Sequence, residues 1–357
     1  MLREHASFDI LGRLECGGSL QLAANETAPD THVITGTLTC AACAHAYLII
    51  RGVPRMIPRQ LARDVEDTVD AFGYQWQQAN TALKDARFSS PEVFLGFIHP
   101  VEPAWFRDKI VLDGGCGIGR FTTASAAFGA RLVIGVDLSA SADVAFENTR
   151  HLPNVLIVQA DILELPLQRK IDYAFSVAVL HHTADPRGAF LHMTSKVVPG
   201  GSVSAWVYGR ENNGWIVHVV NPVRRVTSRL PGAALYRLSQ ALAWGALIPA
   251  VKLVYGPLDR LAPSAAKWLP YGRYLSYVSR FTPRQLHGIV HDHLSAPLAH
   301  YLRREDLESF MTDSPVEELV LRHHNGMSWL ITGRIRARDQ AGPSPAYSES
   351  RSPASRR

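Results

Sequence analysis

The chain has 357 residues and a formal net charge of +5, with 46% hydrophobic and 19% charged residues. This composition predicts a globular protein of one large domain or two, and it excludes a chain that is disordered throughout. No run of 18 apolar residues is uninterrupted, and the start, MLREHASFDI, lacks the pattern of a secretory signal. We therefore expect a cytoplasmic protein with reduced cysteines.

Residues 1–60 have the pattern of a small β module with a cysteine pair, Cys40 and Cys43. Cys16 stands alone, because Arg13 occupies the position of its partner. The segments LECGGSL, GTLTCAACAHAYLI and RGVPRMI resemble the Trm112-like zinc-ribbon family, and a structural zinc of this kind takes four ligands. Since one knuckle is broken, we expect a degenerate ribbon that holds no metal. Two histidines remain alternative fourth ligands, His32 and His45.

Residues 61–104 are predicted to be mainly helical and to link the ribbon to the next domain. Phe72 and Trp76 are four residues apart, so they share one face of the expected helix. Two interpretations stay open for this pair. They are ordinary core residues, or they form an aromatic lid over a ligand pocket.

From residue 109 onward, apolar runs alternate with segments of helix length. The runs lie at 110–113, 131–137, 154–161, 171–180 and 202–209. This alternation predicts a parallel sheet covered on both faces. Residues 316–337 add two strand-like runs around Asn325–Gly326, a dipeptide favoured in tight hairpins. The predicted fold is α/β: a doubly wound, seven-stranded sheet with a closing antiparallel hairpin, plus a small N-terminal β ribbon and a helical insertion.

The stretch VLDGGCGIGRFT, residues 111–122, is a glycine-rich loop between a strand and a helix. Glycines let a loop approach a ligand where a Cβ would collide. Their spacing is GxGxG, and Arg120 stands where the dinucleotide-binding fingerprint GxGxxG has its third glycine. With the closing hairpin, this pattern resembles the class I S-adenosylmethionine-dependent methyltransferases of the type 11 group. The same two features exclude an NAD-dependent oxidoreductase.

The resemblance implies S-adenosylmethionine as cofactor and assigns roles to residues at the strand ends. Asp137, at the end of the second strand, would bind the ribose hydroxyls. Asp161, after the third, would accept a hydrogen bond from the adenine amino group, with Ile162 against the adenine face. One aspartate after a strand is equally well a helix cap, but several at successive strand ends indicate a ligand site. The complete predicted set is Asp113, Gly115, Gly117, Gly119, Asp137, Leu138, Asp161, Ile162, Ser176 and Trp76.

The segment after the fourth strand, FSVAVLHH, resembles methyltransferases that act on quinones and related small molecules, and it lacks N/D-P-P-Y. Methyl transfer from a sulfonium needs a base only if the acceptor is a hydroxyl or an acidic carbon. His181 and His182 are the first candidates for such a base, with a structural role as the alternative. A second candidate set lies in HDHLSAPLAH: Asp292, His293 and His300. The catalytic candidates are thus His181, His182 and His293.

The insertion at 209–285 is strongly basic. Between Arg210 and Arg284 there are eleven Lys or Arg and two acids, a charge of +9, so the rest of the chain sums to −4. Its apolar run ALAWGALIPAVKLVY is expected to be too short to span a membrane and to be interrupted by Pro249. Three interpretations stay open: a solvated helical cap, an interfacial surface for an anionic membrane or lipid-like acceptor, or an RNA-binding surface, the least favoured.

The sequence as a whole predicts a methyltransferase domain at 105–337 and a disordered tail at 338–357. We expect methyl transfer to a small-molecule or lipid-like acceptor, with possible peripheral contact to an anionic membrane and no nucleic-acid partner. The alternative is a catalytically silent interaction scaffold with the same fold.

Overall fold

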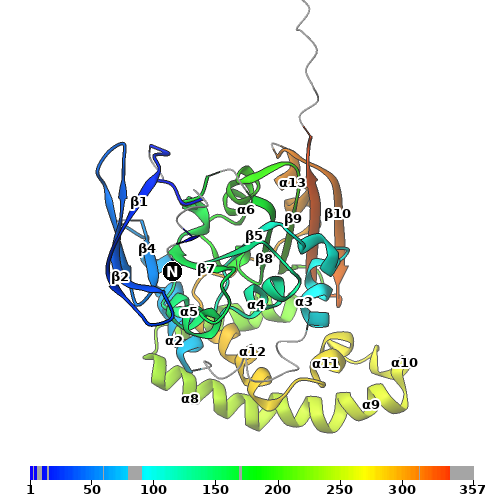
Figure 1. Cartoon of the computed structure of the whole chain (residues 1–357). Helices are drawn as coiled ribbons and strands as arrows, with labels where there is room; N and C mark the ends of the chain where they lie inside the picture. The colour runs from blue at the N-terminus through cyan, green and yellow to red at the C-terminus, as the bar shows by residue number, and fades with distance from the viewer. Residues whose placement is uncertain are drawn as a thin grey trace, which may run out of the picture.

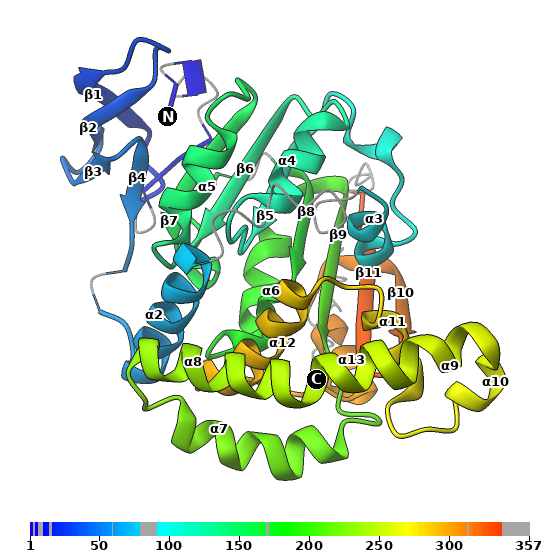
Figure 2. The same ribbon diagram turned by 90° about the horizontal axis from the view of Figure 1, so that it is seen from below.

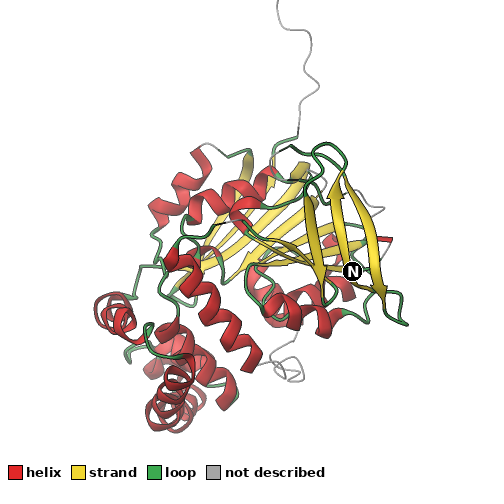
Figure 3. Cartoon of the chain, turned by 90° about the vertical axis from the view of Figure 1, so that its left-hand side faces the viewer, coloured by secondary structure: helices red, strands yellow, loops and turns green. Residues whose placement is uncertain are grey.

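The computed structural model describes residues 1–337 except residues 3, 6–9, 14–15, 59, 79–90, 169–170 and 313, so the predicted disordered tail lies outside the described residues. Eleven strands form one sheet in the order β1-β2-β3-β4-β7-β6-β5-β8-β9-β11-β10 (Figure 1). Helices lie on both faces of this sheet (Figure 3). The predicted α/β fold is confirmed.

Five parallel strands make the centre of the sheet: β7 (Val155–Ala160), β6 (Leu132–Asp137), β5 (Ile110–Gly114), β8 (Ile171–Val177) and β9 (Val197–Tyr208). β11 (Ser328–Ile335) runs antiparallel to β9 and pairs with β10 (Val316–His324). The turn between β10 and β11 contains Asn325 and Gly326 with φ values of 52° and 73°, the left-handed region that this dipeptide tolerates. The predicted closing hairpin is therefore present.

The N-terminal strands extend the central sheet. They are β1 (Leu20–Thr27), β2 (Val33–Cys40), β3 (Ala46–Ile50) and β4 (Val53–Met56), each antiparallel to the next. β4 then pairs in parallel with β7, with Met56 opposite Ala160. The small β module predicted at residues 1–60 thus joins the central sheet, and the buried β4 covers the backbone edge that β7 would otherwise expose.

Two hydrophobic layers cover the sheet. α6 (Pro186–Ser195) and α13 (Arg304–Thr312) pack on one face through residues such as Phe190 and Phe310. Three helices pack on the other face through Phe94, Phe121 and Phe146: α3 (Pro91–Ile98), α4 (Arg120–Ala127) and α5 (Ser141–Thr149). The 3₁₀ turns η2 (Pro103–Phe106), η3 (Ile162–Glu164) and η4 (Leu180–His182) complete the connections.

Two further helices lie beside the insertion, α2 (Arg63–Gln78) and α12 (Pro283–Ser295). The start of α12 is encoded in the sequence Thr282-Pro-Arg-Gln285. The Thr282 side chain accepts from the N–H of Gln285, whose side chain accepts from the N–H of Thr282. Pro283 occupies the first helical position, where its missing N–H costs nothing. This capping box fixes where α12 begins, and thereby which of its polar residues face the cavity.

The insertion is a helical layer that runs along the bottom of Figure 1, below the sheet. Its segments are η5 (Ile216–Val220), α7 (Asn221–Thr227), α8 (Gly232–Leu242), η6 (Ala243–Leu247), η7 (Ala250–Tyr255), α9 (Gly256–Leu261), α10 (Pro263–Ala266) and α11 (Gly272–Val278). It has a small core of its own, formed by Ala243, Ile248, Val251 and Val278 with Leu286 of α12. The insertion is therefore packed against α12 and is not a loose loop.

The expectation that Pro249 interrupts the apolar helix is wrong. The helical path is continuous from Gly232 to Leu261, and Figure 2 shows it as one long helix. Pro249 lies between the π-helical segments η6 and η7, whose wider turns accommodate the missing N–H. Among the described residues this helix is long and apolar enough to cross a membrane by length and composition alone.

Candidate functional site

A cavity of about 950 Å³ lies at the carboxyl ends of β5, β6, β7 and β8. Residues from the turn after each of these strands line it, and residues of α2 and α12 also contribute to its wall. In open α/β sheets this edge is where ligands bind. The volume is at the upper end of what small-molecule sites use, so it has room for two ligands side by side.

The glycine loop after β5 forms one wall of the cavity. Gly115, Gly117 and Gly119 all have positive φ, at 86°, 55° and 84°. A Cβ on Gly115 would lie 2.2 Å from Cγ2 of Val179, and one on Gly117 would face the Trp76 indole at 3.6 Å. Gly115 and Gly117 line the cavity, whereas Gly119 starts α4 and does not. The loop is thus closely packed, with no room for side chains at its first glycine.

Two carboxylates reach the cavity from the next two strands. Asp137 accepts hydrogen bonds from the N–H of Gly117 at 2.9 Å and from the N–H and hydroxyl of Ser139 at 2.9 and 2.7 Å. Asp161 accepts from the N–H of Leu163 at 2.8 Å, and burial raises the pKa of its carboxyl group. Leu138 and Ile162, the neighbours of these aspartates, also line the cavity. All four residues that the sequence predicted for the cofactor site therefore line one cavity, and their contacts with a cofactor stay a prediction.

Asp113 and Ser176 do not line the cavity, contrary to the sequence-based prediction. The buried Asp113 accepts a hydrogen bond from the Thr122 hydroxyl at 2.7 Å, and burial raises the pKa of its carboxyl group to about 7. The hydroxyl of Ser176 donates to the carbonyl oxygen of Gly114 at 2.8 Å. Both side chains are turned inward to partners beside the glycine loop, so they support the loop and do not form part of the cavity wall.

Helix α2 covers the cavity with the aromatic pair that the sequence singled out. Phe72 and Trp76 both line the cavity, and Gln75 lies between them on the same face. The Phe72 ring contacts the His182 ring edge-on, with centroids 4.9 Å apart. Of the two interpretations of this pair, the structure favours the lid.

Three neighbouring side chains face the same cavity: His182, Asp292 and Tyr208. Nδ1 of His182 lies 2.7 Å from the carbonyl oxygen of Leu298, so Nδ1 carries the proton and donates it. Nε2 of His182 is then a lone-pair site, 3.7 Å from Oδ1 of Asp292. The Tyr208 hydroxyl donates to Oδ2 of Asp292.

The charges of this group are set by burial and by its neighbours. Burial lowers the pKa of His182, while Asp292 opposes that shift. Burial alone would raise the pKa of Asp292, but His182, His293 and the Tyr208 hydrogen bond together lower it. The arrangement is therefore a neutral imidazole beside a carboxylate, which is suited to accepting a proton and stabilising the resulting positive charge.

His181 and His293 do not line the cavity, so the prediction that either acts as the catalytic base does not agree with the structure. The His181 ring is fully buried and stacks on Tyr208 with centroids 3.9 Å apart. His293 lies behind Tyr208, where its carbonyl oxygen accepts from Nε of the buried Arg224 at 2.7 Å. Burial lowers the pKa of His293 to about 4. Both histidines support the site from behind.

Tyr208 and Gln75 were missed by sequence reasoning, as was His291. Tyr208 ends β9 and lies 84 residues from Asp292, so only the fold brings their side chains together. A weak signal existed for His291, because His287 and His291 are four residues apart and share one face of α12.

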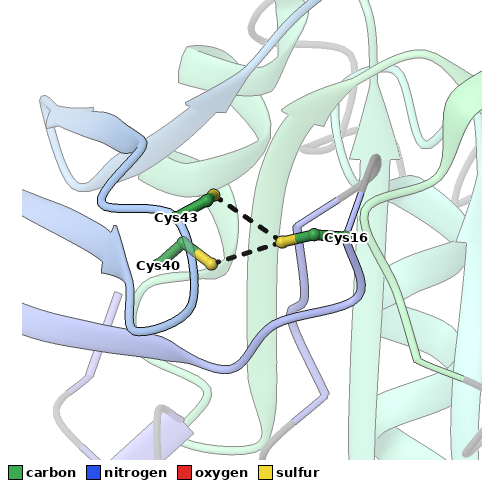
Figure 4. Close-up of side chains that lie close together, drawn as sticks. All are labelled: Cys16, Cys40 and Cys43. Atoms are coloured by element: carbon green, nitrogen blue, oxygen red, sulfur yellow. Dashed lines mark hydrogen bonds between the residues drawn. The ribbon is translucent and has the colours of Figure 1, made fainter.

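The N-terminal cysteines form a second cluster, shown in Figure 4. Sγ of Cys16 lies 3.6 Å from Sγ of both Cys40 and Cys43, and all three sulfurs are within 4.8 Å of one another. Thiolates around a tetrahedral zinc, each about 2.3 Å from the ion, are about 3.8 Å apart. The three thiols thus fit three of the four ligand positions and would tie the segment before β1 to the turn between β2 and β3.

Elemental analysis tests whether this cluster holds a metal. Protein made in zinc-supplemented medium is expected to carry close to one zinc per chain, because three converging thiolates already supply most of a structural site. Cys40→Ser is expected to lose it, while Cys116→Ser, in the buried loop after β5, is expected to keep it. Well under one zinc in the wild-type protein would uphold the sequence-based expectation of an empty ribbon.

Comparison with known proteins agrees with this geometry. Residues 112–205 match a family model described as "Methyltransferase domain". Residues 112–205 thus carry a methyltransferase domain. This match supports the predicted enzyme class and cofactor, and the glycine loop and the strand ends after β6, β7 and β8 fall within the matched residues.

The curated relatives match only part of the chain. A tRNA U34 carboxymethyltransferase of Psychromonas ingrahamii is 32% identical over 115 residues, which is 30% of this chain and 35% of that protein. The protein of the same name from Ruthia magnifica is 34% identical over 83 residues, 22% and 26% of the two chains. The chain thus spans about a third of the length of these relatives.

A solved structure of the magnesium protoporphyrin IX methyltransferase from Synechocystis PCC 6803 is 12% identical. The superposition of the two structures covers 78% of this chain and 100% of that chain, with a TM-score of 0.42.

The expected partners need correction. The sequence favoured a small-molecule or lipid-like acceptor and no nucleic acid, with RNA binding as the least favoured role of the insertion. The relatives contradict this expectation, because they are named for a tRNA substrate. The basic insertion contains no recognisable nucleic-acid-binding module, and for that reason its sequence did not favour RNA.

Proposed function

We propose that this protein is a cytoplasmic enzyme that transfers the methyl group of S-adenosylmethionine to a hydroxyl group of a nucleotide in RNA. The observation that carries the proposal is that one cavity is lined both by residues predicted to bind the cofactor and by a histidine that can act as a base. The glycine loop, Asp137 and Asp161 lie on one side, and His182 with Asp292 lies on another. A scaffold that has lost its activity would have no use for the second set.

The cofactor side of the cavity fits S-adenosylmethionine, which supplies a methyl group activated by a positively charged sulfur. Gly115 and Gly117 line the cavity without side chains, so a ligand can lie directly against the loop backbone. Asp137 would accept hydrogen bonds from the ribose hydroxyls, and Asp161 would accept from the adenine amino group, with Ile162 against the ring. Trp76 would cover the ligand from α2.

The acceptor side performs the proton transfer. His182 accepts the proton of the attacking hydroxyl at Nε2, because its Nδ1 proton is held by the Leu298 carbonyl. The carboxylate of Asp292 stabilises the imidazolium that results, and Tyr208 holds that carboxylate in position. The new bond joins the acceptor oxygen to the methyl carbon as the carbon–sulfur bond breaks. The enzyme contributes mainly by alignment of the reacting groups.

Two observations support RNA as the acceptor. The relatives are named as tRNA carboxymethyltransferases. In addition, nine of the eleven basic residues of the insertion are exposed: Arg210, Arg225, Arg229, Arg237, Arg260, Lys267, Arg273, Arg280 and Arg284. Three exposed tryptophans accompany them, Trp215, Trp244 and Trp268. Exposed aromatic rings among cations suit single-stranded RNA, since bases stack on the rings and phosphates pair with the cations.

Transfer of labelled methyl groups tests the proposal. Wild-type protein with methyl-tritiated S-adenosylmethionine is expected to label unmodified tRNA transcripts. The variant Arg225→Glu/Arg229→Glu/Arg237→Glu is expected to bind this RNA at least tenfold more weakly and with a shallower salt dependence, because it repels phosphates at three positions.

A charge-matched variant controls for net charge. Arg51→Glu/Arg107→Glu/Arg322→Glu reverses three exposed arginines of other elements, so it is expected to bind RNA nearly as the wild type does. Equal weakening by both variants would show that the insertion has no special role. Transfer to none of the transcripts would contradict the RNA acceptor.

A further inference from the structure

A chain of hydrogen bonds connects the N-terminal strands to the cofactor side of the cavity. It begins at Arg55 of β4, whose side chain is 15% exposed. Nη1 of Arg55 donates to Oε1 of Gln159 on β7 at 2.7 Å. The amide nitrogen of Gln159 donates in turn to the carbonyl oxygen of Leu138 at 3.0 Å. Leu138 lines the cavity, whereas Arg55 and Gln159 lie behind its wall.

The register of the strands places these bonds beside Asp137. Arg55 lies opposite Gln159 in the pairing of β4 with β7, and Gln159 lies opposite Asp137 in the pairing of β7 with β6. Asp137, Leu138 and Ser139 follow one another along the chain, and all three line the cavity. The carbonyl oxygen that Gln159 holds therefore belongs to the residue next to the carboxylate proposed to bind the ribose.

Arg55 also holds the other end of the segment that follows β6. Its Nη2 forms an ion pair with Asp143, in the first turn of α5, and donates to the carbonyl oxygen of Ile50 at 2.9 Å. A planar guanidinium can make these bonds together because its N–H groups form a rigid fork, whereas an ammonium group offers a single point of attachment. Residues 138–143 thus lie between two points that one arginine side chain restrains.

Resting on the cofactor site proposed above, we infer that Arg55 is a positioning residue for the cofactor ribose, which acts through Gln159 on the segment that carries Asp137. A carboxylate bonds strongly to a hydroxyl group only within a narrow range of distance and angle, so a shift of this segment weakens the contact. The N-terminal β module is then a working part of the cofactor site, in addition to covering the edge of β7.

Titration calorimetry with two ligands tests this inference. The ligands are S-adenosylhomocysteine and its 2′-deoxyribose analogue, which lacks one of the hydroxyl groups that Asp137 would accept from. The wild-type protein is expected to bind S-adenosylhomocysteine about tenfold more tightly than the analogue, the effect of one charge-assisted hydrogen bond. Arg55→Met is expected to lose most of this preference. Its affinity for the analogue should stay near that of the wild type, which also shows that the variant is folded.

Two further variants make the test specific. Gln159→Glu still accepts from Arg55 but can no longer donate to the Leu138 carbonyl, so it is expected to lose the preference as well. Arg51→Met changes an exposed arginine in the turn before β4 and is expected to keep it.

The outcomes separate this inference from the proposed function. An unchanged preference in both Arg55→Met and Gln159→Glu would overturn the inference. Equal weakening of both ligands in these variants would also overturn it, because it would indicate a purely structural role, and so would the lack of any preference in the wild type. Binding of neither ligand by the wild type would instead contradict the proposed cofactor site itself.

Discussion

Replacing His182 with asparagine is expected to lower kcat for methyl transfer by about 10²–10⁴-fold, the usual contribution of a positioned general base. The variant loses the lone pair at Nε2 that faces the cavity beside Asp292. Its affinity for S-adenosylhomocysteine should not change, because His182 lies on the acceptor side. Single-turnover kinetics with labelled cofactor, together with calorimetry, would separate these two effects.

Asp292→Asn provides a graded comparison. It keeps the shape of the side chain but removes the charge that stabilises the imidazolium, so kcat is expected to fall by less than in His182→Asn. If His182→Asn retained full activity, the acceptor would need no base, and the hydroxyl acceptor would be wrong.

The pH profile follows from the same group. Burial lowers the pKa of His182 below the ordinary histidine value of 6.5, with Arg224 and His300 adding to the shift and Asp292 and the Leu298 carbonyl opposing it. The base is active when neutral, so kcat is expected to be constant at neutral pH and to fall only below pH 6.5. In Asp292→Asn the pKa should fall further, which would move this limb to lower pH.

Asp137→Ala is expected to weaken S-adenosylhomocysteine binding by about 10–100-fold, corresponding to about 1–3 kcal/mol of charge-assisted hydrogen bonds to the ribose. The change also removes the partner of the Gly117 N–H, which loosens the loop. Isothermal titration calorimetry measures the loss directly. Glu164→Ala serves as the control, because this exposed carboxylate lies three residues after Asp161 and does not line the cavity. Equal affinity of Asp137→Ala and the wild type would remove Asp137 from the cofactor site.

The parts of the site that are local in sequence could be predicted. Asp137 and Asp161 follow apolar runs directly, and parallel strands bring their ends to one edge of the sheet. The glycine loop was equally visible, because its three positive φ values require residues without a Cβ.

The sequence did not show whether a side chain of the motif points toward the cavity or into the protein. Asp113 belongs to the same motif as the glycines, yet it turns inward to Thr122.

The acceptor side depends on contacts between distant segments. Phe72, Tyr208 and Asp292 come from α2, β9 and α12, and no spacing in the sequence relates them. His181 and His182 are adjacent, but the turn η4 sends one ring into the core and the other to the cavity. The continuity of the helix from Gly232 to Leu261 was not predicted, because no residue pattern indicates the π-helical turns on either side of Pro249.

The central claim is that the cavity at the ends of β5, β6 and β7 binds the cofactor. Titration calorimetry of the purified wild-type chain with S-adenosylhomocysteine tests it most directly. The predicted result is saturable binding of one molecule per chain, which is weakened in Asp137→Ala and unchanged in His182→Asn. The absence of binding to the wild-type protein would contradict the account and leave the catalytically silent scaffold as the better description.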